Sequence, residues 1–401
     1  KKRRMNTTTQ FLKKDSTGVV ILFLTLSAGF FSLALQNILL VTFCVWAPIS
    51  KSFDYKRVDL KVFLILGVPF FIAIISAFFS ENTSYAYDLA LRRFPLIILG
   101  FFILAIKIRE KDFIFGFKLF TSVSVIASLI MFAKGAVLYF QTGVFLHPNF
   151  AVHFVPIHHP YFGSYILINL MFLDVYYKKI SVNSTVKKSC YLILCISLFV
   201  CSARLPFLFF LLWVFYKNRA YLKQKKTNMK ALMFLVTSIL IISYLFIFKG
   251  LGYKYTQDID LNKSPRLMIW KNSIELIKNN TDFPFLIGIG DYQLEINKLH
   301  RSLMKDKPGM GLIDYNSHNQ YLESIIIGGP LAFVFLVYIG YLIFLSRSTN
   351  NTQLLSFTLF ISLFFFFENV LQRQLGVMLL AILLPVFIKL EKPQNHINEI
   401  A

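Results

Sequence analysis

The chain has 401 residues, of which 56% are hydrophobic and only 15% are charged. Soluble domains carry about a quarter charged residues, and this chain repeats apolar runs that approach the length of a bilayer span. The composition therefore excludes an ordinary soluble protein and predicts an all-α polytopic membrane protein. The net charge of +22 does not predict a nucleic-acid partner, because the basic residues follow the short loops on one side of the predicted spans.

The apolar runs predict about twelve transmembrane spans. In chain order they cover about 18–33, 35–50, 61–79, 94–107, 113–133, 160–177, 189–203, 205–216, 230–250, 321–346, 352–369 and 375–390. The positive-inside rule then puts both termini in the cytoplasm, and the basic start is interpreted as a cytoplasmic tail. The chain divides into a transmembrane bundle at 1–250, a large outer segment at 251–320, and C-terminal spans with a tail at 321–401.

Four arginines lie at the outer ends of spans, against the inside bias of the other basic residues: Arg92, Arg93, Arg204 and Arg373. Arginine makes planar bidentate contacts with phosphate, whereas lysine acts more as a point charge. A single one could snorkel or pair structurally, for instance Arg373 with Glu368. Four on one face favour an anionic ligand at the outer surface.

The outer segment is predicted to form two helices. The first begins at Pro265 and places Arg266 one turn before Trp270. We expect Trp270 to be an interfacial anchor, which puts Arg266 near the depth of the lipid headgroups. Gly288 and Gly290 are interpreted as a tight turn, because they do not open the strand-to-helix unit of a phosphate-binding loop.

A polar cluster ends the outer segment. Ser317 and Gln320 match the Ser-x-x-Gln capping box, which predicts that His318 occupies the first turn of the tenth span on the outer side. The positive end of the helix dipole disfavours imidazolium there, so a neutral His318 could accept a proton. The alternative, that His318 is only an interfacial polar residue, stays open on these grounds.

Other outer histidines gather before the sixth span, among them His158 and His159. Their spacing fits no zinc pattern and no carboxylate accompanies them. A hydrogen-bonding or substrate-contact role is therefore favoured over a metal site.

The last half of the chain resembles the bacterial O-antigen ligase and O-antigen polymerase family. The resemblance depends on three motifs in a fixed order: an Arg-x-x-x-Trp helix, a Pro-then-Gly-x-Gly turn, and a His-Asn pair at the end of the outer segment. Here they are Arg266 and Trp270, then Pro284, Gly288 and Gly290, then His318 and Asn319. A short segment resembling the family's Ser-x-Arg pattern adds Arg204.

The resemblance implies a periplasm-facing, metal-independent, inverting glycosyltransferase that needs no cofactor and is related in fold to C-type glycosyltransferases. Its donor would be a glycan on undecaprenyl diphosphate. The family's two diphosphate-binding arginines correspond to Arg204 and Arg266, and its essential histidine corresponds to His318. Further substrate contacts are expected from Arg92, Arg93, His159, Asn319, Glu368 and Arg373.

The expected activity is O-antigen ligation to lipid A-core in lipopolysaccharide biosynthesis, at the inner membrane and among its lipids. The alternative is an O-antigen or capsular polysaccharide polymerase, whose acceptor is a second lipid-linked repeat. A lipid or sugar transporter is a third alternative. It is disfavoured because the two halves of the chain show no convincing internal repeat.

Overall fold

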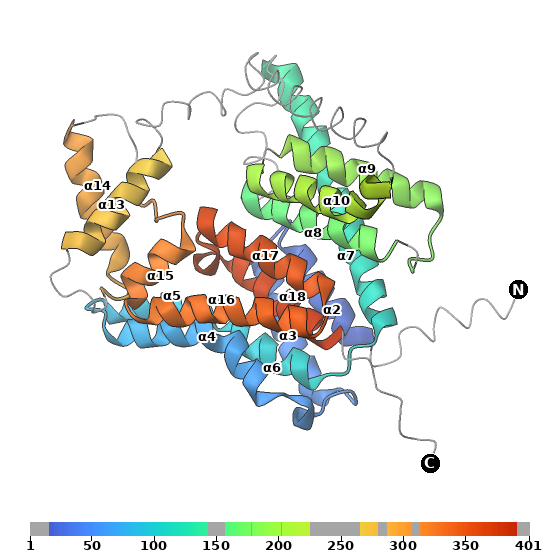
Figure 1. Cartoon of the computed structure of the whole chain (residues 1–401), viewed down its shortest axis with the longest axis horizontal. Coiled ribbons are helices and arrows are strands. Elements are labelled where there is room, and N and C mark those ends of the chain that lie inside the picture. The colour runs from blue at the N-terminus through green and yellow to red at the C-terminus, as the bar shows by residue number, and fades with distance from the viewer. Residues whose placement is uncertain are drawn as a thin grey trace, which may run out of the picture. The chain divides into compact units, whose positions relative to one another are not determined.

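The computed structural model describes residues 16–142, 157–177, 179–201, 203–224, 265–279, 287–306 and 313–390. Within these ranges the regular elements are helices, as predicted (Figure 1). The chain divides into two compact units, one made of 1–29, 33–119 and 269–401, the other of 30–32 and 120–268. Each unit is described by itself.

Three of the described helices are long and apolar enough to cross a membrane. They are α4 (Leu60–Phe78), α7 (Glu110–Thr142) and α16 (Leu331–Ser348). Shorter apolar helices are α2 (Ser16–Ala28), α3 (Leu33–Ile49), α17 (Thr352–Phe367) and α18 (Gln374–Leu390). The predicted span at 230–250 lies outside the described residues, so the count of twelve stays a prediction.

Helix α18 forms the centre of the first unit. Every side chain from Leu375 to Phe387 is buried, as expected of a helix that is apolar on all faces. It packs against α2, α4, α17 and α6 (Pro95–Ala105). The unit therefore has a core that is built from both ends of the chain.

The predicted span at 321–346 is two helices. Helix α15 (Gln320–Gly328) ends at Gly329, which adopts a left-handed φ of 45°, and Pro330 precedes α16. Glycine tolerates this conformation, and proline cannot continue the preceding helix. Ser76 on α4 donates a hydrogen bond of 2.6 Å to the carbonyl of Ile327, close to the break.

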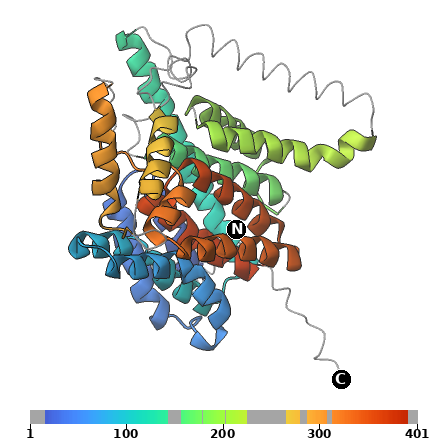
Figure 2. The same ribbon diagram turned by 60° about the vertical axis from the view of Figure 1, so that its left-hand side comes forward.

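The outer segment contains two helices as predicted, α13 (Pro265–Asn279) and α14 (Tyr292–Asp306). Figures 1 and 2 show them beside each other. Leu276 of α13 and Tyr292 of α14 share a buried cluster with Ala77, Ala86 and Ile326. This cluster attaches the outer helices to α4, to α5 (Thr83–Leu91) and to α15.

The second unit contains α8 (His159–Val175), α9 (Ser184–Val200), α10 (Arg204–Gln224) and the later part of α7. Buried Asn169 on α8 accepts a hydrogen bond from Thr121 and donates one to Ser124, both on α7 and both 2.9 Å long. Such interhelical hydrogen bonds satisfy polar groups in an apolar environment.

Candidate functional site

The histidine singled out by the sequence lies in a bend that immediately precedes α15. His318 has a left-handed φ of 45°, and its backbone N–H donates to Asn316 Oδ1 at 3.1 Å. The N-cap is Asn319, whose Oδ1 accepts from the backbone N–H groups of Tyr321 and Leu322. The predicted capping box is therefore wrong, and His318 lies one residue before the cap instead of in the first helical turn.

Long-range contacts explain this difference. Ser317 Oγ shares its proton between the carbonyl of Asn319 at 2.9 Å and Asn369 Oδ1 at 3.1 Å, and Gln320 Oε1 accepts from the backbone N–H of Leu371 at 2.9 Å. Both side chains of the expected capping box are thus bonded to the segment that joins α17 to α18. Asn319 is left to cap the helix.

The side chain of His318 faces a carboxylate from that same segment. His318 Nδ1 lies 3.5 Å from Glu368 Oε2, with side-chain exposures of 17% and 7%. This distance is longer than a formed hydrogen bond, although catalytic hydrogen bonds are often long before substrate binds. Glu368 thus faces His318, while its suggested partner Arg373 is exposed.

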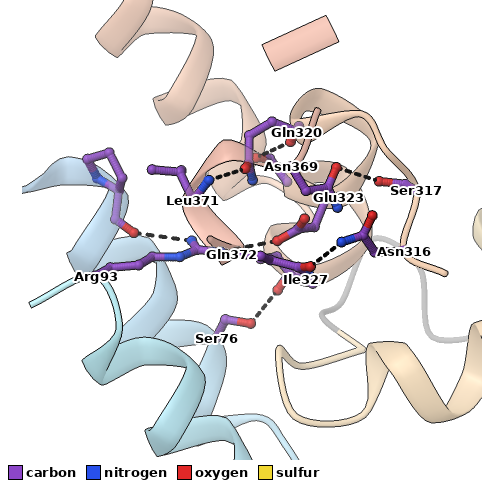
Figure 3. A network of polar contacts seen from close by, with 12 residues as sticks. Ser76, Arg93, Asn316, Ser317, Gln320, Glu323, Ile327, Asn369, Leu371 and Gln372 are labelled. Carbon is purple, nitrogen blue, oxygen red and sulfur yellow. Dashed lines mark hydrogen bonds and ion pairs between the residues drawn. The ribbon is translucent and has the colours of Figure 1, made fainter. Parts of the chain in front are cut away.

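Hydrogen bonds join the two segments on either side of this contact. Asn316 Nδ2 donates to Gln372 Oε1 at 2.5 Å, and Ser317 donates to Asn369 as described above. Figure 3 shows both bonds, together with the bond from Leu371 to Gln320. The loop that carries His318 and the segment that carries Glu368 are therefore held together by side chains.

A buried ion pair also joins α15 to an earlier part of the chain. Arg93 Nη2 lies 3.1 Å from Glu323 Oε1, with exposures of 2% and 0%, and Arg93 Nη1 donates to the carbonyl of Pro69 (Figure 3). Arg93 was expected to contact substrate, yet its guanidinium is enclosed by protein and fixes the α5–α6 turn to α15. Its neighbour Arg92 is exposed. Removing one partner of such a pair typically costs about 3–5 kcal/mol.

Trp270 connects the first outer helix to the His318 loop. Its Nε1 donates to the carbonyl of Ser317 at 2.9 Å, and its ring meets Phe366 edge-on with centroids 5.5 Å apart. The side chain thus contacts protein at a position where a lipid anchor was predicted. Arg266, one turn earlier on α13, is exposed.

A second, buried histidine supports the same loop. His300 on α14 has its Nδ1 2.8 Å from Asn272 Nδ2 and its Nε2 3.4 Å from the carbonyl of Tyr315. Because the amide nitrogen can only donate, Nδ1 accepts and Nε2–H donates, which corresponds to a neutral ring. Burial lowers the pKa of His300. The sequence carried a signal for this role, since Tyr292, Ile296 and His300 recur every four residues on one helix face.

The Gly-x-Gly turn serves to dock the outer helices, and the predicted tight turn is confirmed. Gly288 has a φ of 89°, and a Cβ there would lie 2.8 Å from the Cα of Ser80. The N–H of Gly290 donates to Ser80 Oγ at 3.0 Å. Asp291 accepts from the N–H groups of Glu81 and Asn82 at 2.7 and 3.0 Å. These bonds hold the turn against the α4–α5 connection.

The remaining candidates lie elsewhere. Arg204 is exposed at the start of α10, and His159 begins α8, both in the second unit. The first unit thus brings together His318, Asn319, Glu368 and the Arg93–Glu323 pair. His147 and His153 lie outside the described residues.

Residues 190–337 match the family model described as O-antigen ligase. A search of curated proteins gives no significant match. The matched range includes most of α9, all of α10, α13, α14 and α15, and the first turns of α16, and with them Arg204, Arg266 and His318.

Proposed function

We propose that this protein is a periplasm-facing inverting glycosyltransferase of the inner membrane. The premise is the match of residues 190–337 to the O-antigen ligase family model, which supports an assignment to the O-antigen ligase/polymerase family. The protein moves a glycan from undecaprenyl diphosphate to an acceptor hydroxyl. The observation that carries the proposal is the contact between His318 and Glu368, within a loop that side chains hold in place.

His318 acts as the general base. With Nδ1 directed at the Glu368 carboxylate, Nε2 is the nitrogen that receives the acceptor proton, and the carboxylate stabilises the imidazolium that forms. The acceptor oxygen attacks the anomeric carbon opposite the diphosphate. A new carbon–oxygen bond forms as the bond to phosphate breaks, so the configuration inverts and undecaprenyl diphosphate leaves.

Arginines stabilise the charge of the leaving group. Arg204 and Arg266 are both exposed, and a guanidinium can bind a diphosphate oxygen pair through two parallel hydrogen bonds. In this proposal they provide the positive charge that a divalent metal supplies in other sugar transfers. Arg93 and Asn319 have a different part, because the first is paired with Glu323 and the second caps α15.

The acceptor that we propose is lipid A-core, which makes the protein an O-antigen ligase. A polymerase would use the same donor and base, with a second lipid-linked repeat as acceptor. The lipopolysaccharide of a deletion strain separates the two, because loss of all O-chains indicates a ligase and single-repeat chains indicate a polymerase.

The decisive test of the base is His318→Ala in purified, lipid-reconstituted protein supplied with lipid-linked glycan and acceptor. Removing a general base should lower transfer by about 10²–10⁴-fold while the thermal midpoint stays near wild type. Unimpaired transfer in this variant would refute the proposal.

Arg266→Lys tests the diphosphate contact in the same assay. It keeps the charge and loses the fork, so the donor KM should rise by about tenfold. Arg301→Lys, an exposed arginine on α14, is the matched control and should leave the donor KM unchanged.

A further inference from the structure

We propose that Gln372 and Asn369 are positioning residues that hold Glu368 against His318 through their bonds to Asn316 and Ser317. We call these four residues the loop clamp. The inference rests on the proposed function of His318 and adds residues that act through it. The clamp joins two segments more than fifty positions apart in the sequence, with separations of 56 and 52 residues for its two bonds.

The two bonds connect the chain segments that carry the reacting pair. On one segment, Asn316 and Ser317 immediately precede His318. On the other, Asn369 directly follows Glu368, and Gln372 lies one 3-10 turn later in η4 (Val370–Gln372). A shift of one segment along the other must break at least one bond of the clamp before it separates His318 from Glu368.

The side chain of Asn316 makes two hydrogen bonds, one within its own loop and one to the segment that carries Glu368. Its Oδ1 accepts from the backbone N–H of His318, and its Nδ2 donates to Gln372. The left-handed conformation of His318 costs on the order of 1–3 kcal/mol and persists only where surrounding contacts impose it. One amide therefore couples the strained backbone of His318 to the segment that carries Glu368.

Burial keeps these bonds strong. Asn316, Ser317 and Asn369 are 9%, 0% and 2% exposed, so water does not compete effectively for their polar groups. The bond from Leu371 to Gln320 lies between the two clamp residues of its own segment and adds a third link. The clamp is thus a rigid connection, suited to a contact whose misplacement by about 1 Å can cost 10²-fold in rate.

The test compares Gln372→Met with the wild-type protein after reconstitution in lipid. The substitution removes the acceptor for Asn316 at similar volume. We expect Gln372→Met to lower kcat by about tenfold with the donor KM unchanged, because the diphosphate arginines lie on other elements.

The matched control is Gln374→Met. Gln374, also half-buried and two residues later, donates to Asn37 Oδ1 at 2.6 Å. Its loss removes a comparable amide bond from the same unit, so the thermal midpoint should fall while kcat stays at the wild-type value. A clamp that only stabilised the fold would make the two methionine variants alike in kcat.

His318→Ala is measured in parallel, so that the two ideas can fail separately. If His318→Ala is inactive and Gln372→Met turns over at the wild-type rate, the clamp is refuted and the catalytic base stands. If His318→Ala is active, the proposed function itself fails. Should Gln372→Met not fold, Ser317→Ala removes the other bond with a smaller change, and a wild-type kcat there overturns the inference.

Discussion

In the outer region Gly288, Asp314 and His318 have a left-handed φ, and the stretches around Gly288 and His318 adopt it with opposite kinds of residue. At the docking turn, Gly288 has a φ of 89°, and a Cβ would collide with the Cα of Ser80. At the loop before α15, His318 has a φ of 45° and keeps a full side chain. Both stretches belong to the motifs that resemble the O-antigen ligase and polymerase family.

The two stretches differ in what holds the backbone in the left-handed conformation. Glycine adopts a left-handed φ at little cost, so the docking turn needs only close packing and a few hydrogen bonds. Histidine adopts it against steric resistance, and Asn316, Ser317 and Asn319 surround it with bonds that hold it there. Strain of this kind is concentrated at functional sites, which supports the role proposed for His318.

The largest effect on stability should come from Gly288→Ala. The added Cβ meets the Ser80 backbone and the residue is forced into an unfavourable φ, which together should cost about 2–5 kcal/mol. Thermal unfolding in detergent measures the loss. Gly340→Ala on α16 is the control, because a Cβ there has nothing within 4 Å, and it should be neutral or slightly stabilising.

A smaller and stabilising effect on the free energy of unfolding is expected when His318→Gly is compared with His318→Ala. Both His318→Gly and His318→Ala remove the ring and should lower transfer to the same extent, but only glycine relieves the left-handed strain. The glycine variant should therefore unfold with a free energy about 1 kcal/mol higher than the alanine variant. Equal stabilities would show that the conformation at His318 is unstrained, and the contrast with Gly288 would disappear.

An effect of similar size on the unfolding free energy is expected from Trp270→Phe. The ring contact with Phe366 survives and the hydrogen bond to the Ser317 carbonyl is lost, which should lower the unfolding free energy by about 1 kcal/mol. Transfer activity should fall only a few-fold, since the loop clamp still holds His318. Trp213→Phe is the control, because its indole bonds Asp174 in the second unit. A complete loss of activity in Trp270→Phe alone would make α13 the main support of the loop.

The helices were predictable because each apolar run fixes an element locally. Most of the described helices overlap a predicted span or one of the two helices predicted for the outer segment, whereas the short helix α5 was not predicted. The break after α15 was harder to foresee, because Gly329 and Pro330 stand inside an otherwise continuous apolar run. Only the carbonyl of Ile327, bonded to Ser76 on α4, shows why the chain turns there.

The site was predictable in its residues and not in their partners. His318 and Glu368 were both singled out, yet the sequence paired Glu368 with nearby Arg373 because sequence distance was the only guide. The capping box failed for the same reason. Its Ser317 and Gln320 bind residues 52 and 51 positions away, and a local pattern carries no information about such competition. Arg93 was expected to contact a ligand because nothing in the sequence indicated that it pairs with Glu323.

The pairing of Arg93 with Glu323 also constrains how the protein is made. The two residues are 230 positions apart, and a ribosome adds about 5–20 residues per second. Arg93 therefore waits roughly 12–46 s for its partner to be synthesised, and the ion pair cannot form before then. The contact that fixes the α5–α6 turn to α15 thus depends on a helix that is made much later, so the C-terminal helices complete the N-terminal half of the protein.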